Sequence, residues 1–187
     1  VNISLNNEFD FYKKDYIYIG TVARLVPQKR IDLLIKAFKE VNKLNTKIKL
    51  VILGDGNLKE NLLKQCVNLN LSENIIWINY SEYVTQHMKY WSLFCLTSQY
   101  EGFGLVLLEA IYAKLPVVAM NVSSIKDIVG PCGELVEFGD YLNFAERIKY
   151  ILKNKKNYLK NDYLIKFDPE VNFQKHLKIY KSPEFRL

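Results

Sequence analysis

The sequence predicts an α/β fold in which a mostly parallel, doubly wound, Rossmann-like sheet is covered by helices on both faces. Short apolar runs alternate along the chain with segments whose apolar residues recur at helical spacing. The apolar runs show little polar alternation, which is typical of strands buried on both faces of a parallel sheet. Together these two patterns indicate strands and helices that follow one another in turn.

The first half of the chain contains three expected strands and the helices that connect them. The strands are predicted at residues 16–23, 48–53 and 75–78, where the apolar runs occur. Apolar residues at helical spacing over residues 31–44 and 58–67 predict a helix after each of the first two strands.

The second half continues the alternation, and residues 1–187 are expected to form one domain with its core at 16–153. Strands are expected at 93–97, 116–120 and 134–136, and helices at 84–91, 105–113, 140–153 and 168–180. Ligands of such sheets bind beyond the carboxyl ends of the strands. The loops at this edge are residues 24–30, 54–57, 79–83, 98–104 and 121–126.

Composition and charge exclude several classes of protein. The longest apolar stretch, residues 105–122, is interrupted by Glu109, Lys114 and Pro116 and does not predict a membrane span. A net charge of +6 without a nucleic-acid-binding motif argues against nucleic acid as a partner. The N-terminus has no signal-peptide pattern, and its start at Val1 is typical of a piece cut from a longer chain.

The cysteines indicate a reducing compartment. Cys66, Cys95 and Cys132 are odd in number and widely spaced, which argues against both a disulfide framework and a zinc site. We therefore expect a cytoplasmic protein, and leave open a peripheral contact with the inner face of the membrane.

The segment from Ser98 to Ala110 carries the strongest functional signal. Gly102 and Gly104 stand just before a predicted helix, where backbone N–H groups and the helix dipole favour a phosphate. The helix is apolar nearly all round, so we expect it to be buried and Glu109 to lie in an apolar setting. Glu109 shares a face with Leu105 and could accept hydrogen bonds from a ribose, or it could be neutralised by a core Lys or Arg.

Two further loops are less specific. The loop after the first strand contains Arg24, Lys29 and Arg30, which could neutralise a diphosphate or simply be solvated. The segment Gly54-Asp55-Gly56 lacks the third glycine of a dinucleotide fingerprint, so a tight strand-to-helix turn explains it without a ligand.

The histidines indicate no catalytic or metal site. His87 lies on a predicted helix beside Met88 and Trp91 and is expected to be a packing or surface residue, and His176 lies on the terminal helix. Neither a Ser/His/Asp arrangement nor metal-ligand spacing is present, so we expect no metal.

In order, these segments resemble the C-terminal, donor-binding domain of retaining glycosyltransferases of the GT-B fold, family four. The resemblance covers about residues 16–153. Its most specific element is the pair Glu101 and Glu109, two glutamates separated by seven residues. The other matching segments are Gly20–Leu25 with Pro27-Gln28-Lys29, Gly54-Asp55-Gly56 and Pro116-Val117-Val118-Ala119.

The resemblance implies a role for each matching residue. Arg24, Lys29, Gly104 and Leu105 would bind the donor diphosphate, Glu109 the ribose, and Glu101, Gly102, Phe103 and Gly104 the transferred sugar, with Glu101 in the catalytic position. It also implies transfer with retention of configuration, no cofactor, a nucleotide sugar as substrate and an N-terminal acceptor-binding domain absent from this chain. The family often has glycine where this chain has Arg30, Lys114 and Ser123-Ser124, so the resemblance does not identify the sugar.

Two other functions are compatible with the pattern. One is a nucleotide-binding regulatory module that keeps the site and catalyses nothing. The other is a different enzyme on the same fold, such as a sugar-nucleotide epimerase or a phosphorylase.

Overall fold

Six parallel strands form a single sheet at the centre of the protein. The computed structural model describes residues 9–43, 45–122, 125–158, 163 and 167. The strands are β1 (Ile17–Val22), β2 (Ile48–Leu53), β3 (Ile75–Ile78), β4 (Trp91–Leu96), β5 (Val117–Met120) and β6 (Gly133–Val136). They lie in the order β3-β2-β1-β4-β5-β6, and every neighbouring pair is parallel. The predicted doubly wound sheet is confirmed.

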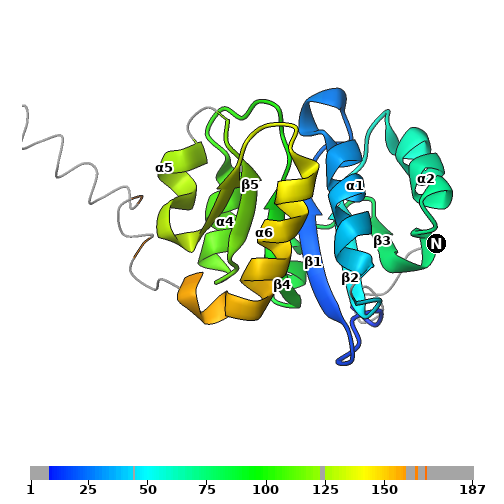
Figure 1. The fold of residues 1–187 in the computed structure, drawn as a ribbon, viewed down its shortest axis with the longest axis horizontal. Helices are drawn as coiled ribbons and strands as arrows, with labels where there is room; N and C mark the ends of the chain where they lie inside the picture. Colours follow the sequence, from blue (N-terminus) through cyan, green and yellow to red (C-terminus); the bar gives the residue numbers. More distant parts are fainter. Residues whose placement is uncertain (1–8, 44, 123–124, 159–162, 164–166, 168–187) are drawn as a thin grey trace, which may run out of the picture.

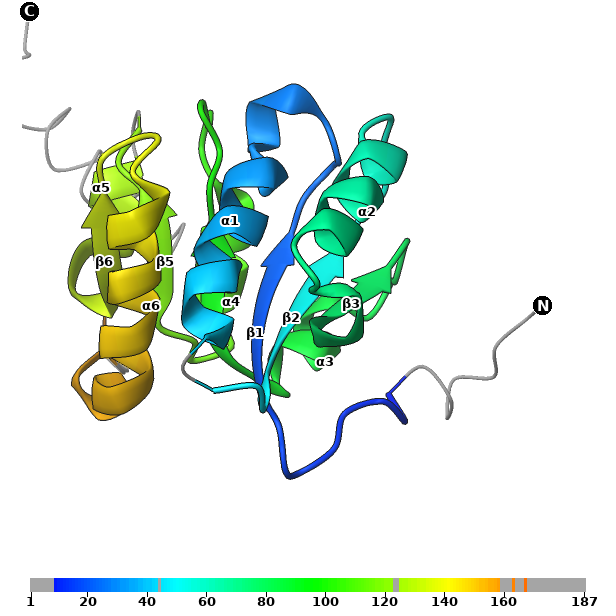
Figure 2. The same cartoon turned by 45° about the vertical axis from the view of Figure 1, so that its right-hand side comes forward.

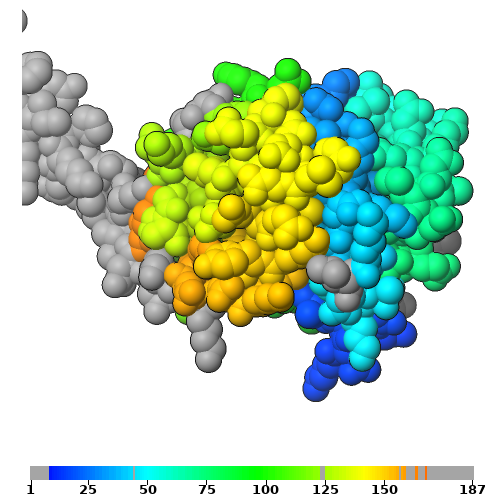
Figure 3. Space-filling model, viewed as in Figure 1, coloured from blue at the N-terminus to red at the C-terminus, as the bar shows by residue number. Residues whose placement is uncertain are grey.

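Among the described residues, six α-helices cover the two faces of the sheet (Figures 1 and 2). They are α1 (Ile31–Asn42), α2 (Lys59–Asn68), α3 (Val84–Met88), α4 (Leu105–Tyr112), α5 (Ile125–Val129) and α6 (Tyr141–Asn154). Side chains of α1, α2 and α6 pack in one buried cluster, and those of α4 and α5 pack with Met88 of α3 in the other. The space-filling view in Figure 3 shows α6 lying beside α1 over the first of these faces.

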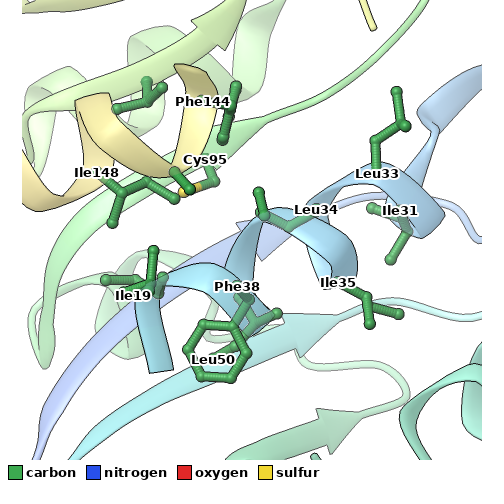
Figure 4. Close-up of a cluster of buried hydrophobic side chains, with 14 of the residues drawn as sticks. Ile19, Ile31, Leu33, Leu34, Ile35, Phe38, Leu50, Cys95, Phe144 and Ile148 are labelled. Carbon is green, nitrogen blue, oxygen red and sulfur yellow. The ribbon is translucent and has the colours of Figure 1, made fainter. Parts of the chain in front are cut away.

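The core beneath α1 and α6 explains why these helices form. Leu34 and Phe38 of α1 are fully buried with Ile19 of β1 and Leu50 of β2, as Figure 4 shows. Burying large aliphatic and aromatic side chains contributes roughly 1.5 to 3 kcal/mol each to folding. Cys95 of β4 lies in the same cluster, and burial raises the pKa of its thiol above the ordinary value.

Most predicted boundaries lie within two residues of the observed ones, and the larger differences are in two places. The expected helix at 84–91 ends at Met88, and Trp91 is instead the first residue of β4. The indole packs over β1, because a Cβ added to Gly20 would lie 2.2 Å from its ring atoms. Part of the expected loop at 121–126 is helical, since α5 begins at Ile125 and buries an apolar face. The predicted terminal helix at 168–180 lies outside the described residues.

His87 is a packing residue, which is one of the two roles that the sequence predicted for it. It is fully buried, and its Nδ1 lies 3.1 Å from the hydroxyl of Tyr12. That hydroxyl also accepts a hydrogen bond of 2.8 Å from Trp91 Nε1. Because α3 ends and β4 begins here, this aromatic group lies at the amino end of the sheet, opposite the predicted ligand edge. The ordered structure therefore extends before residue 16, to at least Tyr12.

Two further expectations concerned disulfide bonds and membrane-spanning helices. None of the three buried cysteines forms a disulfide bond. Burial raises the pKa of the Cys66 thiol to about 11. Within the described part of the chain, no helix combines the length and the hydropathy that crossing a bilayer requires.

Two buried threonines provide a matched test of hydrogen bonding in this core. Thr21 Oγ1 is buried without a hydrogen-bond partner among the described residues, whereas Thr97 Oγ1 donates to the carbonyl of Lys29 at 3.0 Å. Thr21→Val should stabilise the fold by about 1 kcal/mol because it removes an unsatisfied hydroxyl. Thr97→Val should destabilise it by about 1 kcal/mol or more, since it leaves a carbonyl without its donor. Thermal melts should show shifts of about 2 to 4 °C in opposite directions. Shifts of the same sign and size would contradict this account.

Candidate donor-binding site

The candidate site lies where the chain changes from one face of the sheet to the other. β1 and β4 are neighbours, yet β1 leads to α1 on one face and β4 leads to α4 on the other. The loops that follow these two strands therefore diverge above the sheet, at the carboxyl edge seen in Figure 2. Crevices of this kind are where open α/β sheets bind ligands.

Hydrogen bonds join the loop after β1 to the loop after β4. Gln99 N donates to the carbonyl of Gln28 at 2.8 Å, and Gln28 Nε2 donates to the carbonyl of Tyr100 at 2.9 Å. Thr97 Oγ1 donates to the carbonyl of Lys29 at 3.0 Å. We refer to these three bonds as the loop clasp. Residues about 70 positions apart in sequence are thus held in one arrangement.

The Gly54-Asp55-Gly56 turn supports the loop after β1 from the opposite side. Leu25 N donates to the carbonyl of Asp55 at 2.8 Å. A Cβ added to Gly54 would lie 1.9 Å from the carbonyl oxygen of Ala23, and the φ of +144° also favours glycine. The structure agrees with a tight strand-to-helix turn, whose role is to hold the backbone that carries Arg24 and Lys29.

Lys29 and Glu101 form an ion pair at the centre of the site. Lys29 Nζ lies 2.5 Å from Glu101 Oε1, and Ser98 Oγ donates to the same oxygen at 2.9 Å. The two side chains are only 16% and 10% exposed. Glu101 Oε2 makes no hydrogen bond to the described residues and is not among the buried unpaired atoms, so this oxygen is not fully buried and is free to accept a hydrogen bond.

The two arginines of the loop after β1 differ. Arg24 is exposed, and its guanidinium makes no hydrogen bond or ion pair with any described residue. Arg30 binds Asp32 through two hydrogen bonds of 3.0 Å, and its Cζ lies 5.7 Å from the centre of the Phe138 ring. Arg24, rather than Arg30, is therefore available to a ligand.

Arg30 combines an ion pair to Asp32 with an unusual backbone conformation. Arg30 has a φ of 47°, in the left-handed region that favours glycine. The hydrogen bond to Asp32 raises the pKa of Arg30. Burial acts to raise the pKa of Asp32, but the hydrogen bond and charge of Arg30, together with the charge of Lys36 and a backbone hydrogen bond from Leu33, outweigh it, so that the pKa is lowered. These contacts help to hold a conformation that an unpaired side chain would disfavour.

Helix α4 is not buried nearly all round, and this corrects the sequence prediction. Leu105 is 64% exposed, Tyr112 is 75% exposed, and Glu109 between them is exposed as well. These positions share a face because they are three and four residues apart, as expected for Leu105 and Glu109. The opposite face, with Leu107, packs on the sheet. Apolar composition alone could not distinguish an apolar residue that is covered from one that is open.

The exposure of Glu109 decides between two interpretations of this residue. It forms no ion pair with any described Lys or Arg, so the alternative of a glutamate neutralised by a core cation is wrong. Its carboxylate projects from the open face of α4. The role of this carboxylate toward a ribose stays a prediction.

The start of α4 has the geometry of an anion site. Gly104 caps the helix with a φ of 68°, and no side chain caps the helix end. Gly104 itself accepts from Leu107 N through its carbonyl at 2.8 Å. The first amides of a helix lack partners within the helix and carry its partial positive charge. Gly102 and Phe103 are exposed in the loop before Gly104.

The charged residues of the predicted site thus fall into two groups. Lys29 and Glu101 form an ion pair, whereas Arg24 and Glu109 are exposed and form no ion pair with described residues. Gln28, Thr97 and Ser98 were not predicted, although each lies in a loop or strand end that was. In the part of the chain that the structure covers, no three His, Cys, Asp or Glu residues cluster as metal ligands.

Lys114 is the second departure from the family pattern that the structure describes. It follows α4 with a φ of 59°, so the left-handed turn forms without a glycine. Ser123 and Ser124, the third departure, lie outside the described residues.

Comparison with known proteins identifies relatives over most of the chain. The family "Glycosyl transferases group 1" matches residues 5–166. A poly(ribitol-phosphate) α-N-acetylglucosaminyltransferase of Staphylococcus aureus is 30% identical over 88% of this chain and 35% of its own length. A Campylobacter jejuni α-N-acetylgalactosaminyltransferase that acts on a diphospho-undecaprenol substrate is 32% identical over 74% of this chain and 38% of its own length.

Solved structures show the same fold. Staphylococcus aureus TarM, crystallised with UDP, superposes with a TM-score of 0.79 at 28% identity, over 91% of this chain and 37% of its own. Anabaena HepE, crystallised with UDP, superposes with a TM-score of 0.78 at 22% identity, over 90% of this chain and 50% of its own. The chain thus spans between about a third and a half of the relatives it resembles. From the match of residues 5–166 and these relatives, we conclude that the chain belongs to the glycosyl transferases group 1 family.

Proposed function

We propose that this chain is the donor-binding domain of a glycosyltransferase and that it holds a nucleoside diphosphate sugar at the carboxyl edge of its sheet. The observation that carries the proposal is the convergence of Lys29, Glu101 and the start of α4 above the junction of β1 and β4. Cations and helix amides bind phosphate oxygens, and carboxylates accept hydrogen bonds from hydroxyls. A nucleoside diphosphate sugar presents both kinds of group.

The diphosphate is assigned to Arg24, Lys29 and the amides near Gly104 and Leu105. Arg24 has no competing partner among the described residues, so its planar guanidinium can bind two phosphate oxygens. Lys29 supplies a point charge within the site. TarM and HepE, whose structures contain UDP, support the choice of a nucleoside diphosphate.

The ribose and the transferred sugar are each assigned to one of the two glutamates. Glu109 lies four residues after Leu105, about 6 Å along the axis of α4, and is placed to accept from ribose hydroxyls. Glu101 offers its open Oε2 to the transferred sugar, beside the exposed loop of Gly102 and Phe103. A Cβ added to Gly102 meets no heavy atom within 4 Å, so this loop borders open space.

We further propose that transfer proceeds with retention of configuration and without a metal or another cofactor. Two cations and a helix N-terminus can stabilise the negative charge that develops on the departing diphosphate. Retention rests on the resemblance of the Glu101 to Glu109 segment to the retaining enzymes of the family.

The acceptor is assigned to a second, N-terminal domain. This chain covers only 35% to 38% of two similar transferases, so those proteins contain a further part that could hold an acceptor. The open face of α4, with Leu105 and Tyr112, is available to such a domain. We place the protein in the cytoplasm, with peripheral membrane contact as an additional proposal.

The regulatory module is the second candidate, since it would use the same binding residues. Family membership does not favour an epimerase or a phosphorylase. The base and the sugar can be determined by titrating UDP, GDP and ADP sugars against the protein. Failure of every sugar nucleotide to bind would contradict the proposal.

Glu109→Ala should weaken nucleoside diphosphate binding by about 10-fold to 150-fold, because the ribose hydroxyls lose a charged acceptor. The melting temperature should change little, since Glu109 is exposed and has no described ion-pair partner. Calorimetric titration with thermal melts measures both quantities. Glu60→Ala, which removes an exposed glutamate from α2, is the matched control and should leave affinity unchanged. Unchanged affinity in Glu109→Ala would remove this residue from the ribose site.

Arg24→Ala should weaken binding of a nucleoside diphosphate by about 10-fold or more and leave binding of the free nucleoside unchanged, because its target is the phosphate charge. Lys29→Ala should show the same selectivity. Lys89→Ala, which removes an exposed cation at the amino end of the sheet, controls for net charge. Equal losses for nucleoside and nucleoside diphosphate would show that the two cations do not bind phosphate.

The isolated chain should bind a sugar nucleotide but transfer its sugar at a rate close to background. Transfer requires an acceptor hydroxyl held about 3 to 3.5 Å from the anomeric carbon, and such positioning accounts for roughly 7 to 11 kcal/mol of the barrier. Labelled donors and candidate acceptors can be mixed with the chain, with and without its natural N-terminal half. Efficient transfer by the chain alone would disprove the proposed division of labour. Binding without transfer, even when both halves are present, would favour the regulatory module.

A further inference from the structure

Lys29 has two competing partners, the carboxylate of Glu101 and the diphosphate that the proposed function assigns to it. The proposed function, on which this inference rests, assigns Lys29 to the donor diphosphate and Glu101 to the transferred sugar. In the structure Lys29 Nζ lies 2.5 Å from Glu101 Oε1, and both side chains are largely buried. A phosphate that reaches Lys29 must therefore approach a carboxylate that already neutralises this lysine.

The position of this carboxylate is restrained on several sides. Ser98 Oγ donates to the oxygen that Lys29 binds, so Glu101 Oε1 has two donors. The loop clasp joins the two backbones that carry Lys29 and Glu101. The two side chains cannot move apart through separation of the loops unless the clasp breaks. The competition is therefore part of the site and is not relieved by a small loop movement.

We propose that Glu101 determines specificity by disfavouring a nucleoside diphosphate that carries no sugar. Like charges close together in a poorly solvated site repel strongly. When a sugar is attached, its hydroxyls can donate to the open Oε2 of Glu101, and this contact offsets the repulsion. When the sugar has been transferred, the offset is lost and the carboxylate favours release of the nucleoside diphosphate product.

Arg24 provides an internal comparison for this competition. It is exposed and has no described acidic partner, so it binds phosphate without displacing a carboxylate. Glu101 should therefore change the contribution of Lys29 to phosphate binding and leave that of Arg24 nearly unchanged.

The test is a double-mutant cycle measured by calorimetric titration with UDP, UDP-sugars and inorganic pyrophosphate. If GDP or ADP binds the wild type more tightly than UDP, that nucleotide and its sugars are used, and pyrophosphate serves as the base-independent probe. Glu101→Gln should bind UDP and pyrophosphate about 5-fold to 10-fold more tightly than the wild type, because it keeps hydrogen bonding and removes the negative charge. It should not bind the UDP-sugar more tightly, so the preference for the sugar nucleotide falls.

Repeating Glu101→Gln in the Lys29→Ala and Arg24→Ala backgrounds distinguishes competition for Lys29 from a general effect of the substitution on the structure. In Lys29→Ala the gain from Glu101→Gln should be at most about 2-fold, whereas in Arg24→Ala it should persist at about 5-fold to 10-fold. Glu73→Gln removes an exposed carboxylate before β3 and should leave UDP affinity unchanged. If Glu101→Gln melts at a markedly lower temperature, Glu101→Asp, which shortens the reach to Lys29, should still strengthen UDP binding.

The outcomes distinguish this inference from the proposed function. Unchanged or weaker UDP binding in Glu101→Gln, or an equal gain in the Lys29→Ala background, overturns the inference while the donor site stands. Binding of UDP by the wild type without binding of any UDP-sugar contradicts the proposed function itself. Absence of all binding in every variant contradicts both.

Discussion

The reversal of strand order between β1 and β4, where the connecting helices change from one face of the parallel sheet to the other, is the constraint on which the rest of the site depends. Strands of a parallel sheet are joined by right-handed crossovers, so the order β3-β2-β1-β4-β5-β6 sends α1 to one face and α4 to the other. The two connecting loops then separate above adjacent strands. No side chain has to create this crevice, because the order of the strands already determines where it lies.

The loop clasp and the glycine turn convert this opening into a defined arrangement of charge. The clasp fixes the backbones of Lys29 and Glu101 relative to one another, and the turn at Gly54 holds the preceding backbone from below. Arg30 adds a further restraint through Asp32 and Phe138. Charged side chains of a binding site are most effective when their positions are set before the ligand arrives. The loops of this site are joined to one another by hydrogen bonds, whereas the side chains of Arg24 and Glu109 are exposed and form no ion pair with described residues.

The distribution of exposed apolar residues also follows from the layered architecture. Leu107 faces the sheet and is buried, whereas Leu105 and Tyr112 face away from it and are open. Among the described residues, no further element covers these two side chains. An exposed apolar face beside a polar site is typical of a surface that meets a ligand or another domain. The relatives are about two to two and a half times as long as this chain, so they contain parts that have no counterpart in it.

The sequence by itself determined the fold class, the strands and most helix positions, because burial on both faces of a parallel sheet leaves uninterrupted apolar runs. β2 and β3 were predicted to the residue, and the loops of the carboxyl edge could be identified as the segments that follow each predicted parallel strand. Local patterns also identified Lys29 and Gly104 as candidates, and the resemblance to the family added Glu101. Their chemistry depends on residue type and on position relative to a helix start, both of which are properties of the local sequence.

Only the tertiary structure decided which candidates meet and which of them are exposed. The contact between Lys29 and Glu101 joins positions 72 residues apart and depends on β1 and β4 being neighbours. The difference between Arg24 and Arg30 depends on Asp32 and Phe138, and the exposure of Glu109 depends on where the next layer ends. The start of β4 at Trp91 likewise depends on Gly20, because any Cβ at that position would clash with the indole ring. Periodicity shows which face of a helix is apolar, but what covers that face is determined by distant parts of the chain.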